Sequence, residues 1–421
     1  MRDGGVSELG IAAFHRLYEL MLAGDRGLLP TAELTPATGL PAYESLPAAA
    51  GSAALDRTVV IKLNGGLGTT MGLAGPKSLI EVKPGVSFLD VIARQVLHLR
   101  AATGARLPLV LMNSFATRDE SLAALARHPD LAAAGVPADF VQHREPRLRA
   151  DTLAPVELPD DRAAEWCPPG HGDLYAAIAA SGMLAALRGA GFRYAFVSNA
   201  DNLGASLDPR VIEWFAGGGI PFAMEAIEGT AADRKGGHIA VRDGQLVLRE
   251  TAQVPDSDAD SFRDYKRWKY YNTNNLYVDL DALASTLDSG GGVLPLTLIV
   301  NRKTVDSIDV IQLETAMGAA IGVIPGARAL VVRSDFYTLG ADGLAVPADP
   351  SGRPPVVDLD PAYYKVLPDF EARFPGGAPS LRQARSLTVR GDVHFGHGVV
   401  VVGDVTVEGP AKVPDGTVLG E

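Results

Sequence analysis

The stretch TVVIKLNGGLGTTMGLAGPKS, residues 58–78, joins a run of β-branched and apolar residues to a loop rich in glycine. Residues 58–63 predict a strand. The glycines that follow let the backbone approach a polyphosphate and point several N–H groups at it, while Lys77 supplies a point charge. The stretch therefore predicts a phosphate-binding turn after a strand; a tight turn without a ligand is the alternative.

Neither of the two best-known phosphate-binding motifs fits this loop. A P-loop is excluded because no Gly-Lys-Ser/Thr closes the loop. The dinucleotide fingerprint fails because Gly66-x-Gly68 is followed by Met71, where glycine or alanine should stand. An NAD-dependent dehydrogenase is therefore disfavoured.

Downstream of this loop, short β-branched runs alternate with segments rich in alanine and leucine, which predicts an α/β fold with a parallel sheet. Strands are expected at 58–63, 107–112, 194–198 and 220–227, helices at 88–99, 120–127 and 176–187, and a hairpin at 237–241 and 245–248 around Asp243-Gly244. Such sheets bind ligands at the carboxyl ends of their strands, so the site is expected in the loops after Leu63, Met112 and Ser198.

The two ends of the chain differ from this middle part, which divides the sequence into units at 1–50, 51–345 and 346–421. The first unit has an amphipathic helix at 6–22 and a connection rich in proline, alanine and glycine at 29–54. In the last unit, apolar residues recur at intervals of six: Leu387, Val393, Val399, Val405 and Ala411. This period predicts coils of a β-helix, stacked on the sheet or on a second subunit as a homo-oligomer; a pair of hairpins is the alternative.

Composition excludes several classes of protein. Among 421 residues, 38 are basic and 50 acidic, which leaves a net charge of −12 and no general attraction for nucleic acid or an anionic membrane. The single cysteine, Cys167, excludes an intramolecular disulfide and every multi-cysteine zinc site. No apolar run approaches the ~18 residues of a membrane span. We therefore expect a cytoplasmic protein with small anionic ligands.

Residues 58–78 and seven further blocks occur in the order of one known family. The blocks are LMNSF (111–115), VQHREPR (141–147), PPGHGD (168–173), SNADNLG (198–204), DRKGG (233–237), YNTNNL (271–276) and VIQLETAMG (310–318). Together they resemble the eukaryotic-type UTP–glucose-1-phosphate uridylyltransferases, or UDP-glucose pyrophosphorylases, over about 58–321. The resemblance implies a Rossmann-like, glycosyltransferase-A-like mixed sheet with a C-terminal left-handed β-helix domain.

The resemblance also implies a reaction, in which UTP and glucose 1-phosphate give UDP-glucose and pyrophosphate reversibly, with Mg²⁺ as cofactor. The sugar phosphate oxygen attacks the α-phosphorus of UTP in line. Because this nucleophile is already an anion, the protein needs no activated side chain. It must instead align two anions and neutralise the charge that develops.

The family's functional residues fall on matching positions of this sequence. Those implied to bind the nucleotide are Leu63, Asn64, Gly65, Gly66, Gly68, Lys77, Gln142, Gly170 and Asp201, with Gln142 reading the uracil edge and Asp201 holding the metal. Those implied to bind the sugar phosphate are Gly66, His171, Asn199, Glu225, Lys235, Asn274 and Asn275. Lys77, Lys235 and Asp201 are implied to be catalytic.

Several of these and neighbouring residues have simpler interpretations. Asp173 precedes a predicted helix and is expected to be an N-cap rather than a catalyst. Asp201 alone would suit a turn. Cys167 and His171 do not form a nucleophilic pair, because no third residue orients them. The basic run of Lys266, Arg267 and Lys269 around Trp268 is expected to be a solvated face.

The sequence departs from the family at one place. Relatives carry Pro-Val-Lys-Thr-Thr, whose lysine reaches the nucleotide phosphates, whereas residues 319–332 here run directly into Arg333-Ser334-Asp335. The chain is shorter by under about twenty residues, a loop-sized change. Either the natural protein lacks the segment or the sequence in hand omits it, and Arg333, a candidate substitute, matches the later strand better.

This departure leaves two alternatives open. If the loss is real, activity should be weak or absent, which would make the chain a non-catalytic UDP-sugar or UTP-binding protein. Within the enzyme class, the substrate could instead be another sugar 1-phosphate, such as N-acetylglucosamine 1-phosphate or galactose 1-phosphate.

Overall fold

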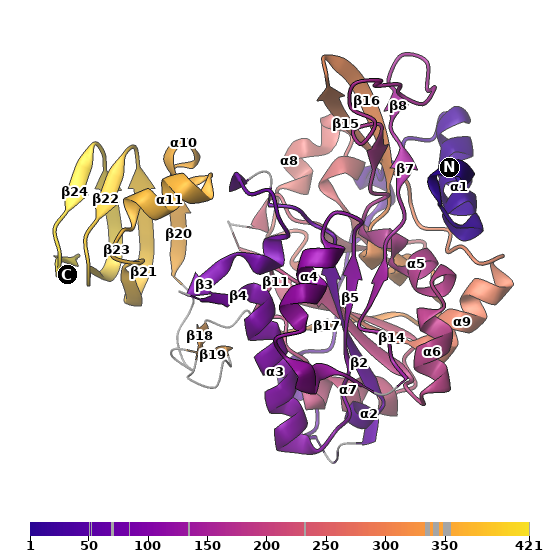
Figure 1. Cartoon of the computed structure of the whole chain (residues 1–421), viewed down its shortest axis with the longest axis horizontal. Helices are drawn as coiled ribbons and strands as arrows, with labels where there is room; N and C mark the ends of the chain where they lie inside the picture. The colour runs from indigo at the N-terminus through magenta and orange to yellow at the C-terminus, as the bar shows by residue number, and fades with distance from the viewer. Residues whose placement is uncertain are drawn as a thin grey trace.

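A central sheet with helices on both faces forms the body of the molecule (Figure 1). The computed structural model describes residues 1–49, 51, 53–68, 71–83, 85–133, 135–230, 233–332 and 355–420, and the backbone of 337–339 and 345–347. The main sheet contains β1 (Thr35–Pro36), β2 (Thr58–Asn64), β5 (Leu109–Asn113), β6 (Asp139–Val141), β10 (Tyr194–Asn199), β11 (Phe222–Glu228), β12 (His238–Arg242), β13 (Gln245–Arg249), β14 (Tyr270–Asp279) and β17 (Arg328–Val331).

The strand order of this sheet identifies where a ligand can bind. Its path is β1-β12-β14-β10-β2-β5-β6, and β11 joins β14 to β17. The strands β10, β2, β5 and β6 are parallel, whereas β14 runs antiparallel to β10. The order reverses between β2 and β10, and doubly wound sheets bind ligands at such a switch point. The mixed α/β fold is confirmed, with predicted strand boundaries shifted by one or two residues.

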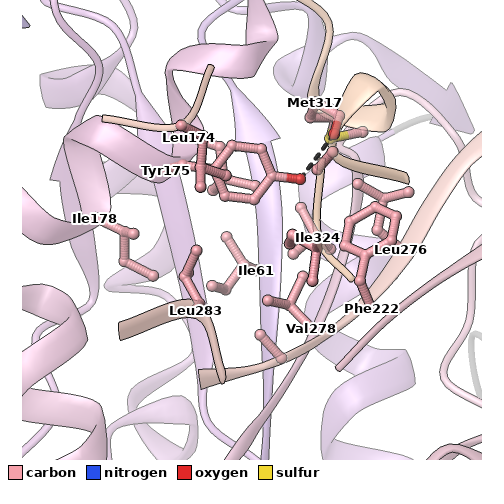
Figure 2. Packing of buried hydrophobic residues seen from close by; sticks show 14 of the residues in the cluster. Ile61, Leu174, Tyr175, Ile178, Phe222, Leu276, Val278, Leu283, Met317 and Ile324 are labelled. Atoms are coloured by element: carbon pink, nitrogen blue, oxygen red, sulfur yellow. Dashed lines mark hydrogen bonds between the residues drawn. The ribbon is translucent and has the colours of Figure 1, made fainter. Parts of the chain in front are cut away.

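Each face of the sheet carries its own hydrophobic core. One face packs against α5 (Leu174–Ala180), α6 (Met183–Gly189) and α9 (Leu280–Ser289). The other packs against α2 (Ala53–Asp56), α3 (Phe88–Thr103), α4 (Arg118–Leu125) and α7 (Pro209–Gly217). Figure 2 shows the first core, where the Tyr175 hydroxyl donates to the Met317 carbonyl at 2.7 Å, so that the ring's polar end is satisfied within an apolar cluster.

Local turn chemistry explains one confirmed and one wrong prediction. The hairpin between β12 and β13 turns at Asp243 and Gly244, both with positive φ, as such a turn requires. The single helix predicted at 176–187 is wrong. It is two helices, α5 and α6, because Gly182 adopts a left-handed conformation with φ of 76° between them.

The N-terminal segment belongs to the main body. Helix α1 (Glu8–Leu22) is capped by Ser7, whose hydroxyl accepts from Gly10 N at 3.1 Å, and it packs its apolar side on the hairpin of β15 and β16. Residues 29–46, predicted as a connection, pack on the sheet instead: β1 pairs with β12, and Leu46 lies in a core. Residues 29–46 therefore pack on the main body.

Shorter elements surround this body. They are the pairs β3 (Glu81–Lys83) with β4 (Val86–Ser87), β7 (Glu145–Pro146) with β9 (Trp166–Cys167) and β18 (Tyr337–Leu339) with β19 (Ala345–Pro347), the sheet of β15 (Ile299–Val305), β16 (Ile308–Glu314) and β8 (Leu148–Arg149), and helix α8 (Ala259–Phe262). Within the described part of the chain, no helix is long and apolar enough to cross a membrane.

The C-terminal strands stack in parallel. β20 (Val356–Leu359), β21 (Ser380–Arg390), β23 (Val400–Glu408) and β25 (Val418–Leu419) form one layer, β22 (Val393–Phe395) and β24 (Ala411–Val413) a second, and α10 (Pro361–Tyr364) and α11 (Leu367–Arg373) lie between β20 and β21. Val393 pairs with Ala411 and Val400 with Val418, so each residue pairs with one three hexapeptides further along the chain, in the next coil. Parallel pairing contradicts the hairpin alternative.

A cluster of aromatic side chains packs around His238, the first residue of β12. The His238 ring is fully buried and stacks on Trp268 with centroids 4.6 Å apart, and neither ring nitrogen has a hydrogen-bond partner among the residues that the structure describes. Burial lowers the pKa of His238 to about 3, and the Arg249 cation adds to this effect. His238 is therefore neutral in the folded protein near pH 7.

This burial predicts how stability depends on pH. Because the folded pKa of His238 lies below the unfolded value, the unfolded chain binds more protons between pH 6.5 and 3, and stability falls as the pH is lowered through this window. His238→Phe keeps the ring but removes the titration. We expect its unfolding free energy at pH 7 to stay within about 1.5 kcal/mol of the parent and its loss on acidification to be smaller.

Urea unfolding at pH 7 and pH 4.5 measures both quantities. His15→Gln on α1 is the matched control, since the His15 side chain is 70% exposed beside Glu19. If His238→Phe lost as much unfolding free energy between pH 7 and pH 4.5 as the parent does, the interpretation would be contradicted.

Candidate functional site

A polar pocket lies where the parallel strands end. It encloses about 740 Å³ of space open to solvent, and its walls are Leu63, Asn64, Gly65, Gly66, Lys77, Ser78, Gln142, Pro168, Gly170, His171, Asn199, Ala200 and Asp201. Leu63 pairs with Asn199 across β2 and β10, and Asn113 pairs with Val141 across β5 and β6. The register therefore brings the segments after β2, β6 and β10 to one edge. The sequence predicted the segments after Leu63 and Ser198, but the loop after Met112 does not line the pocket, and the segment after β6 takes its place.

Residues 66–68 and 75–77 of the glycine-rich loop lie side by side as an antiparallel pair. Gly68 N donates to Gly75 O at 3.0 Å, and Lys77 N donates to Gly66 O at 3.1 Å. The N–H of Gly68 is thus already paired within the loop, so the predicted donation from Gly68 to a phosphate is not available in this conformation. Gly66 lies in the pocket wall with the aliphatic part of Lys77 alongside it.

The Gln142 side chain lies directly over Gly65. A Cβ atom on Gly65 would stand 2.7 Å from Gln142 Oε1 and 2.8 Å from Nε2, closer than real Cβ contacts allow. The backbone of Gln142 is held by donation of its N–H to Asn113 O at 2.8 Å. Glycine at position 65 therefore makes room for an amide that can donate and accept along one base edge.

Lys77 and Asp201 face each other across the pocket. Lys77 Nζ lies 3.8 Å from Asp201 Oδ2, and both side chains are partly exposed to solvent. The end of β10 is fixed beside the glycine loop because Ala200 N donates to Leu63 O at 3.1 Å. A cation and a carboxylate at one open edge can divide between them the binding of a phosphate chain and of a divalent ion.

His171 is a neutral hydrogen-bond donor. Its Nδ1 accepts from Met317 N at 3.0 Å, which leaves the proton of the neutral ring on Nε2. Burial lowers the pKa of His171 to about 4. Cys167 cannot act as its nucleophilic partner, because burial raises the pKa of the thiol well above its ordinary value, with the nearby Glu145 carboxylate as the next cause. The structure thus agrees with rejecting a Cys/His pair.

The backbone of residues 169–172 is pressed against Thr315. Gly170 has φ of 79°, and a Cβ there would stand 2.5 Å from Thr315 O. Gly172 N donates to Thr315 O at 2.8 Å, and Thr315 N donates to Pro169 O at 3.1 Å. Thr315 therefore sets the position of Gly170 and His171 although it lies outside the pocket wall. Only its place in a matching block pointed to it in the sequence.

Glu225 and Asn275 are buried and outside the pocket wall. Glu225 accepts from Asn275 Nδ2 at 2.8 Å and from the Tyr277 hydroxyl at 3.0 Å, and burial raises its pKa. The structure does not bring either residue into the pocket wall, so their sugar-binding role stays a prediction. Lys62 is also buried, donates to Ser198 Oγ at 2.7 Å and has a pKa lowered to about 7 by burial.

Three other residues predicted to contact a ligand lie outside the pocket wall or use their side chains in hydrogen bonds within the protein. Lys235 is exposed outside the wall, and its carbonyl accepts from Thr251 Oγ1 at 2.6 Å. Asn274 has a left-handed backbone and its side chain accepts from Asn272. Asn64 contributes to the wall, but its side-chain amide donates to Asn113 and Ser121, so it ties β2 to β5 and α4.

Two sequence interpretations concern residues around the site. Asp173 occupies the N-cap position of α5, as predicted, but makes no capping hydrogen bond; its carboxylate turns to His143. The basic run is exposed, as expected, with Arg267 over the Trp268 ring and Lys269 paired with Glu228. Arg333, considered as a substitute for the family lysine, falls outside the described residues.

The crowding at Gly65 generates a prediction. Gly65→Ala should leave stability unchanged, because only the flexible end of Gln142 must move, yet weaken the binding of a uridine nucleotide by about tenfold, the loss expected for one good hydrogen bond. Calorimetric titration with UTP measures the affinity. Gly189→Ala is the control, since a Cβ there meets no atom within 4 Å. Equal affinities in the two variants would contradict the role of this contact.

Comparisons with known proteins identify the family of this chain. A sequence profile described as UTP–glucose-1-phosphate uridylyltransferase matches residues 12–339 and 323–402. An enzyme of that name from Solanum tuberosum is 39% identical over 390 residues, 87% of this chain and 80% of the relative. One from Hordeum vulgare is 38% identical over 450 residues, 99% of this chain and 93% of the relative.

Solved structures show the same likeness in three dimensions. A mutant of the UDP-glucose pyrophosphorylase from Leishmania major, in complex with UDP-glucose, superimposes with a TM-score of 0.92 at 41% identity, covering 100% of this chain and 96% of that one. The Trypanosoma brucei UDP-glucose phosphorylase gives a TM-score of 0.91 at 40% identity, with the same coverage. The chain therefore belongs to the UTP–glucose-1-phosphate uridylyltransferase family.

Proposed function

We propose that this protein catalyses the reversible transfer of a uridylyl group from UTP to glucose 1-phosphate, releasing pyrophosphate. The observation that carries the proposal is the convergence of the glycine loop, Lys77, Gln142, His171 and Asp201 in one pocket at the switch point of the sheet. Family membership at this level of identity supports the same reaction.

The proposed roles follow from what each group can donate or accept. Gln142 pairs with the uracil edge, and Gly170 completes base recognition through its backbone. Gly65 and Gly66 bring the backbone close to the phosphates, and the Lys77 ammonium neutralises their charge. His171 Nε2–H donates to the sugar phosphate, and its lowered pKa keeps this donor in the same neutral form throughout the physiological range.

The chemistry is an in-line displacement. A phosphate oxygen of glucose 1-phosphate attacks the α-phosphorus of UTP, the new P–O bond forms, and the bond to the bridging oxygen of pyrophosphate breaks. The protein supplies alignment and charge rather than a nucleophile. The roles of Lys235, Asn199, Glu225, Asn274 and Asn275 toward the sugar phosphate stay proposals that rest on the family pattern.

A Mg²⁺ ion is proposed as the cofactor. Asp201 is the carboxylate in the pocket wall, and Mg²⁺ is commonly bound through one or two carboxylates together with substrate phosphates and water. The residues present therefore fit this ion, with Asp201 as its protein ligand. When bound, the ion would neutralise charge on the phosphates.

We also infer the finer architecture. The order β6-β5-β2-β10 with antiparallel β14 supports a glycosyltransferase-A-like sheet, and the parallel stacking of β21, β23 and β25 supports a left-handed β-helix. Assembly of a homo-oligomer through this last unit, a domain boundary near 346 and a cytoplasmic location are proposals that the sequence motivates.

Turnover by the purified chain tests the proposal. Pyrophosphate-dependent formation of UTP from UDP-glucose with Mg²⁺ should be observed and should stop when the metal is removed with a chelator. Binding of UDP-glucose without turnover would identify a non-catalytic binding protein instead. A clear preference for UDP-N-acetylglucosamine or UDP-galactose would replace glucose by another sugar.

The pairing of Lys77 with Asp201 predicts how two variants differ. Lys77→Gln should lower kcat by at least about 100-fold, because a preorganised charge on the reacting phosphates is lost. Asp201→Asn should chiefly raise the Mg²⁺ concentration needed for half-maximal rate. Lys269→Gln, an exposed lysine paired with Glu228, is the control. Unchanged metal dependence in Asp201→Asn would exclude Asp201 as the metal ligand.

A further inference from the structure

A chain of hydrogen bonds connects the N-terminal helix to both sides of the pocket. His143 Nδ1 lies 2.7 Å from Asp173 Oδ1, and His143 N donates to Asp173 Oδ2 at 2.6 Å. On its other side, His143 Nε2 lies 2.6 Å from the Ser7 hydroxyl, which in turn accepts from Gly10 N at the start of α1. The side chain of Asp173 is 2% exposed and that of His143 is 10% exposed.

The hydrogen bonds in this chain are mutually consistent. The Asp173 carboxylate accepts from His143 Nδ1, and the Ser7 hydroxyl is the hydrogen-bond partner of His143 Nε2. The Ser7 oxygen still accepts from Gly10 N. Each polar atom between α1 and Asp173 thus has a partner, as buried polar networks require if they are to hold one geometry.

Two members of this network, His143 and Asp173, adjoin the two sides of the pocket. His143 follows Gln142, the residue that lies over Gly65. Asp173 follows the Gly170–His171–Gly172 turn, and its own N–H donates to Gly170 O. The bidentate contact between Asp173 and His143 therefore couples the base-edge side of the pocket to the phosphate side, although these segments are 30 residues apart.

Close packing holds α1 against the same place. A Cβ on Gly10 would stand 2.6 Å from His143 Cδ2, so the imidazole lies directly on the helix backbone. Arg144 donates to Gly4 O at 2.6 Å while its guanidinium covers the Trp166 ring at 4.6 Å. Through these contacts the N-terminal segment packs against His143 and Arg144, the residues that follow Gln142.

We propose that Ser7, His143 and Asp173 form a positioning clamp, through which helix α1 fixes the Gln142 amide against the His171 turn and so sets affinity and selectivity for the uracil base. These are positioning residues, because none of them lies in the pocket wall. The proposal rests on the proposed function for its kinetic consequence, but the clamp itself is defined without any ligand.

The connectivity Ser–His–Asp is also that of a hydrolytic triad, but the surroundings favour a clamp. The Ser7 hydroxyl is the N-cap of α1 and is held by Gly10 N. Covalent labelling of Ser7 by a fluorophosphonate probe should therefore not occur, and its occurrence would overturn the positioning role.

His143→Phe tests the clamp, since it retains a ring against Gly10 while removing both ring hydrogen bonds. In steady-state assays we expect KM for UTP to rise about tenfold, the preference for UTP over CTP to fall by a similar factor, and kcat and KM for glucose 1-phosphate to change less than about threefold. Ser7→Ala should give a smaller shift in the same direction, and Ser7→Thr should restore parental values. The control Ser45→Ala removes an exposed hydroxyl that donates to Ala42 O in the N-terminal segment.

Hydrogen exchange without ligand separates the clamp from the proposed activity. The amides of residues 142–144 should exchange at least about tenfold faster in His143→Phe and Ser7→Ala than in Ser45→Ala. If the parent protein showed no uridylyl transfer but this difference persisted, the function would fail and the clamp would stand. Unchanged exchange at these amides, or equal rises in KM for both substrates in folded variants, would overturn the clamp.

Discussion

The parallel pairing of β2 with β10 is the constraint on which the rest of this structure depends. From β2 the chain adds parallel β5 and β6 on one side of the sheet and then returns to place β10 on the other side, so the strand order reverses between β2 and β10. Beyond β10 the sheet continues with antiparallel β14. The register places Leu63 opposite Asn199, which sets the glycine loop beside Asp201. Of the remaining wall residues, Gln142 follows β6, and Gly170 and His171 are held in place by Thr315.

The sheet also contains buried polar side chains, which reduce stability but fix the neighbouring strands and loops in one arrangement. Lys62 is a lysine inside an apolar strand, where burial lowers its pKa to about 7, and Glu225 is a carboxyl group whose pKa is raised by burial. Such groups are tolerated because Lys62 donates to Ser198 and Glu225 accepts from Asn275 and Tyr277. Since Lys62 also donates to Ala205 O, it anchors the loop that carries Asp201.

Three histidines show how partners, rather than residue type, decide a role. His171 accepts at Nδ1 and keeps a donor at Nε2 for the pocket, whereas His143 uses both nitrogens within the protein. Within the described part of the chain, His238 has no polar partner at either nitrogen and serves as an aromatic ring on Trp268. Their short-range sequence surroundings do not distinguish these three states, because the deciding partners, Met317, Ser7 and Trp268, come from distant segments.

The sequence by itself determined the local features: strand β2, its glycine loop, the turn at Asp243-Gly244 and the six-residue period of the C-terminal unit. Each of these depends on backbone preferences or periodicity over a few residues. Resemblance to a family then named Gln142, which follows a strand of only three residues and carries no periodic signal. Only the tertiary structure decided that Gly182 divides a helix, that Gly68 is paired within its loop, that Glu225 is buried against Asn275 and Tyr277 and that Asp173 turns to His143. The partners of Asp173 and Glu225 lie 30 and up to 52 residues away along the chain, and burial and hydrogen-bond partners exist only once those segments meet.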